Sequence, residues 1–501
     1  MSNSAYGNGR APLLDALISH SRKRLKPFHF PGHKAGRGAD REFSTLMGRG
    51  AMAIDLTELP GLDDLHSPRG PILEAERLAS ELNGADTTFF LVNGSTVGIH
   101  AMVMASCAPG DEIILARDVH RAFVGAVVLS GALPVFISPE IHPRFSLSMG
   151  VTIGAVSRAL SQYPRARAVG IVSPNYYGIC APVDGIVREV KRYGKIMLVD
   201  QAHGSHLRFM RGGPSTALLE GADAVVESTH KTMGSLTGTA MLHLKGDFVD
   251  RARVKRALRI LQTSSPSYIL LASLDAARRR ASVSGYEDVS RACRLASRAR
   301  EAINALPGLH CLTEDDLEEP AAGAGFRLDP TRLVVSVSGL GLNGWQAEEI
   351  LRKHHGIQVE FADEEHVILV ITLADEGSDI DALISAMEDL GRARAVRGPG
   401  SCHRLRRLLE QAMVPPPLRV PPREAFFAPS RPVEVSRSAG MISAEEVAIY
   451  PPGIVIIWPG EEIVEPAIEY LLRACERGAR LQGLDDPTGR HIRVVAGPSR
   501  G

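Results

Sequence analysis

Features that mark secreted, membrane-spanning and zinc-binding proteins are missing from this sequence. Its six cysteines are scattered, and no two form a C-x-x-C pair, a pattern that fits reduced thiols better than a disulfide framework or a zinc site. The N-terminus lacks a basic start followed by an apolar core, and no apolar run reaches about 18 residues. We therefore expect a cytoplasmic protein that is neither secreted nor inserted in a membrane.

The charge balance excludes a polyanion as the main partner. Lysine plus arginine number 57, as do aspartate plus glutamate, so the formal net charge is zero. Nucleic acids and acidic membranes attract proteins that carry a surplus of basic residues. We therefore expect no nucleic-acid and no membrane partner.

Strands and helices alternate over the first half of the chain. With 501 residues, the chain is expected to form two or three structural units. Short apolar runs predict seven strands, at Phe89–Val92, Glu112–Ala116, Pro134–Ile137, Ala168–Val172, Ile196–Asp200, Ala224–Val226 and Thr239–His243. This alternation is typical of the α/β class, with a mainly parallel sheet that helices cover on both faces.

Changes in composition divide the chain into five parts. We expect a glycine- and turn-rich N-terminal arm over residues 1–71, a large domain over 72–265 and a smaller α/β domain over 266–390. Residues 391–422 are rich in arginine and proline and are expected to form a short helix and a linker. A C-terminal α+β domain is expected over 423–501.

Lys231 stands in an unusual setting. It follows a predicted strand and is surrounded by small hydroxyl residues and glycines, in Glu227-Ser-Thr-His-Lys-Thr-Met-Gly. In a partly dry pocket the charged form of an amine is disfavoured, so the amine can act as a nucleophile and form a Schiff base with an aldehyde. Pyridoxal phosphate (PLP) carries such an aldehyde. The alternative is an ordinary loop lysine among capping hydroxyls.

Asp200 provides the second half of the pattern. It ends the strand Ile196–Asp200 and is followed by Gln-Ala-His-Gly. PLP requires a carboxylate against its pyridine nitrogen, because the protonated ring is the strong electron sink. In open α/β sheets ligands bind at the carboxyl edge of the strands, which suits Asp200. An aspartate followed by a lysine in this order favours a PLP site.

Two further strand ends carry polar residues. Gly94, Ser95 and Thr96 follow the first strand and start a helix, where backbone N–H groups and the positive end of the helix dipole favour a phosphate. Capping of the helix is the alternative role. His120 follows the second strand and is placed to lie flat on the cofactor ring, or to serve as a structural hydrogen-bonding group.

The histidines after Asp200 are not expected to hold a metal. His203 and His206 form an H-x-x-H pair, but no third ligand stands at a recognisable spacing. We therefore predict no metal site.

These motifs, in this order, resemble the bacterial family of PLP-dependent ornithine/lysine/arginine decarboxylases. The resemblance covers Phe28 to about Val495 and includes Phe-His-Phe-Pro-Gly-His-Lys from Phe28, Thr-Glu-Leu-Pro-Gly-Leu-Asp-Asp-Leu from Thr57, Asn-Gly-Ser-Thr from Asn93, Asp-Gln-Ala-His-Gly from Asp200, Ser-Thr-His-Lys from Ser228, Pro-Arg-Glu-Ala-Phe-Phe from Pro422 and Tyr-Pro-Pro-Gly-Ile from Tyr450. It implies the aspartate-aminotransferase type of fold (fold type I) with a seven-stranded sheet, in the short form that lacks an N-terminal wing domain.

The resemblance also implies roles for individual residues. Lys231 would hold the cofactor aldehyde and Asp200 the pyridine nitrogen, while His120 would stack on the ring. The remaining cofactor contacts would come from His203, Ala202, Gly94, Ser95, Thr96, Ser228 and His230, with Lys231 or His230 returning a proton to Cα. The weaker candidates for substrate contacts are His33, Asp63, Asp64, Glu445 and Glu446. A homodimer or larger homo-oligomer with a shared site is implied as well.

The implied reaction is decarboxylation of a basic L-amino acid, with arginine favoured over lysine and ornithine. Several positions depart from the family pattern, namely Gln201, Arg121, Gly234, Gly238, Met441 and Val455. None removes a residue that PLP chemistry requires. They leave open a second hypothesis, in which the same carbanion is used for transamination or for oxygen-dependent oxidation in specialised biosynthesis. A third is a binding or regulatory subunit without turnover.

Overall fold

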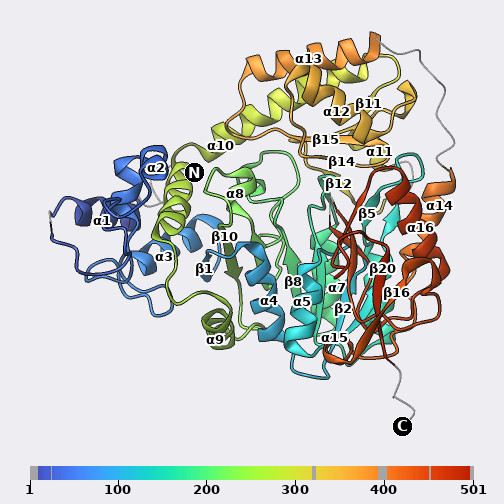
Figure 1. Ribbon diagram of the computed structural model, residues 1–501, viewed down its shortest axis with the longest axis horizontal. Coiled ribbons are helices and arrows are strands. Elements are labelled where there is room, and N and C mark those ends of the chain that lie inside the picture. Colours follow the sequence, from blue (N-terminus) through green and yellow to red (C-terminus); the bar gives the residue numbers. More distant parts are fainter. Residues whose placement is uncertain (1–8, 24, 319–322, 393–402, 451–452, 497–501) are drawn as a thin grey trace.

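The computed structural model describes residues 9–23, 25–318, 323–392, 403–450 and 453–496. Figure 1 shows the N-terminal arm on the left, a small sheet unit at the top, the C-terminal unit on the right and the large unit between them. Residues 393–402 of the predicted linker lie outside the described residues. The site described below lies on the large unit.

The large unit is built on a seven-stranded sheet in the order β1-β10-β9-β8-β6-β2-β3. The strands are β1 (Thr87–Leu91), β2 (Glu112–Ala116), β3 (Leu133–Ile137), β6 (Ala168–Val172), β8 (Ile196–Asp200), β9 (Ala224–Glu227) and β10 (Ala240–Leu244). Only β10 runs antiparallel to its neighbours in this sheet, β1 and β9. The predicted α/β class, with a mainly parallel seven-stranded sheet, is confirmed.

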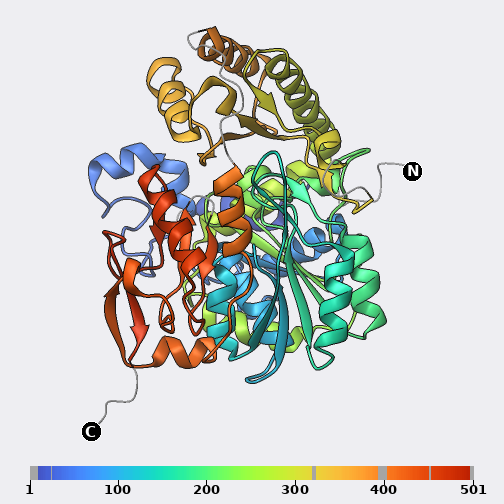
Figure 2. The ribbon, with the colours of Figure 1, turned by 90° about the vertical axis from the view of Figure 1, so that its right-hand side faces the viewer.

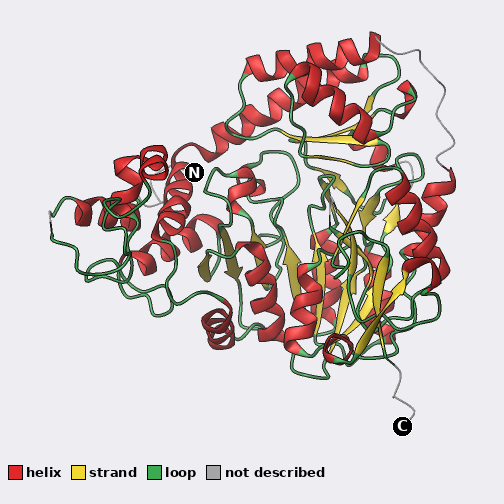
Figure 3. Cartoon of the chain, in the orientation of Figure 1, coloured by secondary structure: helices red, strands yellow, loops and turns green. Residues whose placement is uncertain are grey.

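Helices cover both faces of this sheet (Figure 3). On one face α4 (Gly94–Ser106) packs against α5 (Ala122–Ser130) and α9 (Arg251–Leu261), and on the other α6 (Ile153–Gln162) packs against α7 (Val183–Arg192). Right-handed crossovers between parallel strands produce this division. Because both faces are covered, the strands are almost wholly buried and read as continuous apolar runs.

The small unit is a four-stranded antiparallel sheet covered by helices. Its sheet order is β11-β13-β15-β14, with β11 (His310–Cys311), β13 (Arg332–Ser336), β14 (Phe361–Ala362) and β15 (His366–Val370). Its helices are α10 (Tyr268–Asn304), α12 (Gly344–His355) and α13 (Gly377–Arg392). Helix α10 has 37 residues and joins the large and small units.

The C-terminal unit packs against the large unit beside β2 and α5 (Figure 2). Its elements are α14 (His403–Ala412), α15 (Pro422–Phe427), β16 (Ser430–Glu434), β17 (Val447–Tyr450), β18 (Ile454–Ile457), α16 (Glu465–Glu476), β19 (Arg480–Gln482) and β20 (His491–Val495). Short elements complete the described chain: β4 (Glu140–Ile141), β5 (Ser148–Gly150), β7 (Ile179–Cys180), η1 (Leu207–Phe209), α8 (Thr229–Thr232), α11 (Glu314–Glu318), β12 (Arg327–Leu328), η2 (Ser338–Leu340) and η3 (Val435–Arg437).

The N-terminal arm has an apolar contact surface of its own. Helix α1 (Pro12–Ser21) buries Leu13 and Leu17 fully against α3 (Pro71–Asn83) and the start of α10, while α2 (Arg41–Ile54) packs on α1. The backbone N–H groups of Leu13 and Leu14 donate to the buried Asp275 of α10. The arm is therefore tied to the body of the protein by packing and by a buried carboxylate.

A buried carboxylate on α3 lies beside the first strand of the sheet. Glu76 is only 7% exposed, and its carboxylate accepts a hydrogen bond of 3.0 Å from the backbone N–H of Phe90. Burial raises the pKa of Glu76 from 4.5 to about 8. Because the folded state holds this proton more tightly than the unfolded state, the free energy of unfolding falls as pH rises from 4.5 to about 8.

Glu76→Gln is therefore expected to stabilise the protein at neutral pH. An amide keeps an oxygen for Phe90 but carries no charge, so the free energy of unfolding should rise by about 3 kcal/mol at pH 7 and by almost nothing at pH 4. Urea unfolding at the two pH values measures the difference. Glu81→Gln, on the exposed side of the same helix, is the matched control. A Glu76→Gln protein less stable than wild type at pH 7 would contradict the prediction.

Candidate functional site

Four parallel strands of the large unit end at the same edge of the sheet. Gly94 follows β1, and His120 follows β2. Asp200 is the last residue of β8, and the segment that carries Lys231 follows β9. Parallel strands bring their carboxyl ends together, so residues more than 100 positions apart meet there. The structure thus gathers the principal residues predicted from the sequence at one edge.

Lys231 is held at this edge by a chain of hydrogen bonds. It lies in α8, a single turn directly after β9, and its Nζ is 3.0 Å from Nε2 of His203. On the other side of that ring, Nη2 of Arg332 is 3.1 Å from Nδ1. Lys231 itself is exposed, whereas His203 and Arg332 are buried.

This arrangement determines the protonation of His203. A guanidinium can only donate hydrogen bonds, so Nδ1 of His203 must accept from Arg332. Burial lowers the pKa of His203 well below 6.5, and the charges of Lys231 and Arg332 lower it further, so the ring is neutral. The single ring proton is then on Nε2 and faces the Lys231 amine.

Lys231 is consequently placed to accept a hydrogen bond, which requires its neutral form. Loss of hydration lowers the pKa of the Lys231 amine from 10.5; the Asp200 carboxylate opposes this change, and Arg332 adds to it. A neutral amine has the lone pair that attack on an aldehyde requires.

Asp200 lies at the end of β8 and is 2% exposed. Burial raises its pKa to about 6, while Lys231 and a 3.0 Å hydrogen bond from the backbone N–H of Ala202 act in the opposite direction. At pH 7 the carboxylate is ionised but poorly solvated. It therefore gains strongly from a cationic partner such as a protonated ring nitrogen.

Helix α4 starts just after the carboxyl end of β1. Gly94 adopts a left-handed backbone conformation (φ 70°), and its N–H donates to the carbonyl of Gly238 at 2.7 Å. Helix α4 packs so closely on the sheet that a Cβ on Gly98 would lie only 2.5 Å from the Val226 side chain. Ser95 and Thr96 occupy the first turn of this helix. Ser228 lies just before Lys231 in the chain. Its Oγ is buried and has no hydrogen-bond partner among the described residues.

His120 follows β2 and is the first of three rings that lie in a row, His120, Tyr176 and His203. Its ring centroid is 6.4 Å from that of Tyr176, which lies 5.4 Å from the ring of His203 in an edge-to-face arrangement. Burial lowers the pKa of His120 to about 4, and Lys231 and Arg121 contribute to the shift. A neutral, flat ring of this kind suits stacking on an aromatic cofactor.

The remaining histidines have separate partners. His230 Nδ1 donates to the Thr239 carbonyl at 2.6 Å, and burial lowers its pKa below 6.5. His206 Nε2 is 3.0 Å from the Asp329 carboxylate, so His203 and His206 do not share a site. Among the residues that the structure describes, no group of three or more His, Cys, Asp or Glu side chains is arranged to hold a metal ion.

Most of the departures from the family pattern have packing roles. Gln201 donates to the carboxylate of Glu227 at 2.6 Å and accepts from the N–H of Ala217 at 2.7 Å, so its amide is fully engaged. Val455 is completely buried, and Met441 packs against the apolar cluster of the C-terminal unit. Gly234 and Gly238 both take positive φ angles, which favours glycine at these positions.

The five weaker candidates for substrate contacts are engaged in the monomer. His33 Nε2 pairs with Asp55 at 3.1 Å. Asp63 accepts from the first N–H groups of α3, including Gly70 at 2.7 Å and Ile72 at 3.1 Å. Asp64 accepts from the N–H of His66. Glu445 accepts from the N–H groups of Asp485 and Arg493, and Glu446 accepts from the Arg121 side chain.

Sequence reasoning missed three residues that act on His203 or Lys231: Tyr176, Arg332 and Glu360. Burial lowers the pKa of both Lys231 and Arg332, and the Glu360 carboxylate opposes that change at each. Glu360 is exposed between the buried Val359 and Phe361. The alternation over Gln358–Phe361 predicts a strand that presents Glu360 to solvent, and in the structure β14 begins at Phe361.

Family models match almost the whole described chain. The model described as "Orn/Lys/Arg decarboxylase, major domain" matches residues 11–379, and that of the C-terminal domain matches residues 412–489. The chain is 39% identical over 489 residues to an arginine decarboxylase of Bacillus anthracis, and 39% identical over 484 residues to one of Bacillus subtilis. In both comparisons the match covers 97% of each chain.

Solved structures agree on the fold. A lysine decarboxylase of Francisella novicida matches with a TM-score of 0.83 at 19% identity, over 97% of this chain and 81% of that one. Lysine decarboxylase A of Pseudomonas aeruginosa matches with a TM-score of 0.84 at 19% identity, over 97% and 80%. The expected fold type I is confirmed. No helix within the described ranges is both long and apolar enough to cross a membrane.

Proposed function

The chain belongs to the Orn/Lys/Arg decarboxylase family, and we propose that it uses pyridoxal phosphate to convert L-arginine to the corresponding amine and CO2. Membership alone supports an enzyme that decarboxylates a basic amino acid. The choice of arginine rests on the relatives that match over the full length, which are named arginine decarboxylases.

The observation that carries the proposal is the hydrogen-bond chain Arg332–His203–Lys231. The neutral His203 presents Nε2–H to a lysine amine 3.0 Å away, which keeps that amine unprotonated and nucleophilic. An ordinary loop lysine needs no such neighbours. The ionised Asp200 at the adjacent strand end completes the pair of groups that PLP chemistry requires.

The residues present fit this cofactor. Lys231 would hold its aldehyde carbon, Asp200 its pyridine nitrogen and His120 the face of its ring, with Ala202 and His203 close by. The phosphate would be held by Gly94, Ser95 and Thr96 at the start of α4, and by Ser228 and His230. The buried Ser228 Oγ, which has no partner within the described residues, supports a ligand there.

Bound PLP supplies an electron sink for the pair released when the Cα–carboxylate bond breaks. The chain's own residues orient the reactants and manage protons. Asp200 keeps the ring nitrogen protonated, because a buried carboxylate favours a cation beside it. Lys231 or His230 returns one proton to Cα, and the low pKa values of His120 and His203 keep both rings neutral during turnover.

The test is to offer arginine, lysine and ornithine separately to the purified protein with PLP, following CO2, amine and oxygen together. We expect arginine to give CO2 and amine in equal amounts without oxygen uptake, and to have the highest kcat/KM. Oxygen consumption or a keto product would instead assign the chain to transamination or oxidation. An absence of turnover with all three would sink the proposal.

We further propose Glu360 as the group that pairs with the distal cation of the substrate. Glu360 is exposed, and its carboxylate acts to raise the pKa of both Lys231 and Arg332, against the effect of their burial. Glu445 and Glu446 are less suitable, because both carboxylates already accept hydrogen bonds within the C-terminal unit or from Arg121. A carboxylate and a guanidinium can form two parallel hydrogen bonds.

Glu360→Gln is therefore expected to raise the KM for arginine by about 10- to 100-fold, the worth of one charge-assisted hydrogen bond. Steady-state kinetics with arginine measures this change. Citrulline, the uncharged isostere of arginine, should be handled equally by both proteins. Glu349→Gln, a surface change on α12 of the same unit, is the control. An unchanged KM for arginine would exclude Glu360 from the substrate site.

We also propose that the enzyme is a cytoplasmic homodimer or larger homo-oligomer that shares its site between subunits. The N-terminal arm exposes large apolar side chains, with Phe28 94%, Phe30 79% and Leu46 83% exposed. Large apolar side chains exposed in this way favour a protein partner. The described cysteines are unpaired thiols, which supports a reducing compartment. Sedimentation velocity of the pure protein gives the assembly state.

A further inference from the structure

The segment Arg117–Arg121, here called the His120 segment, lies between two units of the protein. It joins β2 to α5 in the large unit and contacts β18 of the C-terminal unit, through the backbone of Ile454 and the carbonyl of Ile456. His120 is its fourth residue. Contacts from the C-terminal unit reach both the start and the end of this segment.

At its start, Arg117 forms a buried ion pair with Glu461. The two side chains are 0% and 1% exposed, and Nη2 of Arg117 lies 2.8 Å from Oε2 of Glu461. The same Nη2 donates to the Ile456 carbonyl at 2.9 Å, and Glu461 also accepts from the N–H of Trp458 at 2.9 Å. A charge pair so deeply buried is costly unless it is fully hydrogen-bonded, which makes its geometry specific.

At its end, Arg121 is held by two side chains of the C-terminal unit. It pairs with Glu446, and its Nη1 donates to Oε1 of Gln482 at 3.1 Å. Between the two arginines, the backbone of His120 forms an antiparallel bridge with Ile454. Gly453 has φ 103°, and a Cβ there would lie 3.5 Å from Cδ2 of the His120 ring, so the C-terminal unit also contacts the ring edge.

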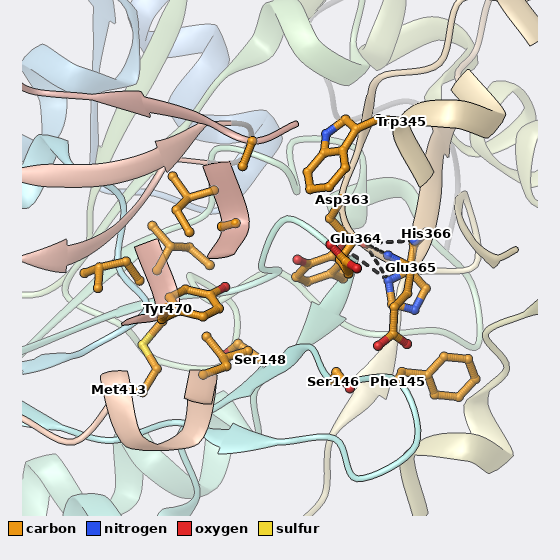
Figure 4. Close-up of a pocket in the computed structure, with 17 residues that line it drawn as sticks. Phe145, Ser146, Ser148, Trp345, Asp363, Glu364, Glu365, His366, Met413 and Tyr470 are labelled. Atoms are coloured by element: carbon orange, nitrogen blue, oxygen red, sulfur yellow. Dashed lines mark hydrogen bonds and ion pairs between the residues drawn. The ribbon is translucent and has the colours of Figure 1, made fainter. Parts of the chain in front are cut away.

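Apolar packing does not account for this placement by itself. Ile454 and Ile456 line a cavity of about 80 Å³ where the large, small and C-terminal units meet, together with Tyr177, Asp363 and Tyr470 (Figure 4). Close packing fixes the depth of β18, because Val455 and Ile457 are 0% and 2% exposed, but apolar contacts have no preferred direction. The polar contacts at Arg117 and Arg121 add that direction, because each has directional hydrogen bonds.

We infer that the C-terminal unit positions the His120 ring for cofactor stacking, with Glu446 and Glu461 as positioning residues. The inference rests on the proposed function, since it concerns the ring assigned to the cofactor face. Anchors at both ends of a five-residue segment restrict its backbone, and the ring between them keeps one orientation before the cofactor arrives. Such preorganisation raises the affinity for the cofactor, because the entropy cost of ordering the ring has already been met when the protein folds.

The test measures PLP binding by the purified full-length protein rather than turnover alone. Glu446→Gln is expected to raise the Kd for PLP about fivefold and Glu461→Gln about 100-fold, from the usual strengths of half-exposed and buried pairs. Both should weaken the induced circular dichroism of the bound cofactor. The exchange Arg121→Glu with Glu446→Arg restores the pair and should return the Kd to within about twofold of wild type.

Two reference proteins separate the possible outcomes. Glu462→Gln breaks an exposed pair with Arg419 in the same unit and should leave the Kd unchanged. His120→Ala reports the contribution of the ring itself. If His120→Ala weakens binding while folded Glu446→Gln and Glu461→Gln do not, the positioning role is wrong. If His120→Ala has no effect, the stacking role in the proposed function is wrong.

Kinetics distinguishes positioning from direct substrate contact. A positioning residue changes the affinity for PLP and the dichroism, whereas a substrate contact changes the KM for arginine and leaves both untouched. A raised KM in Glu446→Gln with an unchanged Kd for PLP would overturn the inference and return Glu446 to the substrate site. Thermal unfolding of Glu461→Gln shows whether the buried variant is folded. If the Glu461→Gln protein is not folded, the variants of the Arg121–Glu446 pair decide whether the inference holds.

Discussion

Replacing Lys231 with alanine is expected to lower kcat by about 10⁴-fold or more, the usual scale for loss of a residue that acts as both nucleophile and proton carrier. The chain Arg332–His203 would remain, but its Nε2–H would no longer face an amine. Borohydride reduction followed by mass spectrometry should find PLP attached to the wild-type chain and none attached to the variant.

Lys195→Ala is the matched control for this experiment. Lys195 lies before β8, and its Nζ donates to the carbonyl of Pro164 at 2.6 Å, away from the carboxyl edge of the sheet. Its removal should leave both kcat and cofactor attachment unchanged. PLP that remained reducibly attached in the Lys231→Ala protein would show that another amine holds the cofactor, and the whole site would have to be reassigned.

Asp200→Asn is expected to have the second largest effect. Removing one partner of a buried charge pair costs about 3–5 kcal/mol, so kcat or PLP affinity should fall by roughly 10²- to 10³-fold. Asparagine keeps the shape and the oxygen that accepts from Ala202, so loss of charge is the only large change. Absorbance titration with PLP and steady-state kinetics measure the two effects. Asp184→Asn, a surface pair with Arg188, is the control.

The same carboxylate predicts a pH dependence of cofactor binding. Burial raises the pKa of Asp200 from 3.8 to about 6 in the cofactor-free protein. As pH falls through 6, Asp200 takes up a proton and no longer attracts a ring cation, so the affinity for PLP should fall. Asp200 itself makes the cofactor-free protein less stable as pH rises from 3.8 to about 6, because a buried charge then forms.

The Asp200→Asn protein isolates this contribution. The phosphate of the cofactor also titrates near pH 6, so wild-type data alone would mix two groups. The variant keeps the phosphate and lacks the carboxylate. The ratio of the two dissociation constants should therefore be large at pH 8 and should shrink at pH 5. A ratio independent of pH would contradict the assignment of Asp200 to the ring nitrogen.

The sequence by itself determined the fold class and singled out Asp200 and Lys231 as candidate site residues. The predicted strands that became β2, β6 and β8 have the predicted bounds, because buried parallel strands are short apolar runs with clear ends. Asp200 and Lys231 stand directly at or after such ends, and their chemistry is unusual enough to be recognised without coordinates. The family motifs added the reaction class, which the matching relatives support.

The tertiary structure decided which side chains meet. Arg332 contacts His203 across 129 residues, and Arg117 contacts Glu461 across 344. No local pattern encodes such pairs, because periodicity and turn signals describe only residues a few positions apart. The same limit explains Asp63, Glu445 and Glu446, whose charges suggested a substrate but whose carboxylates are engaged by N–H groups or by Arg121. A carboxylate's role depends on which donors the folded chain brings to it, and that is a property of three-dimensional packing.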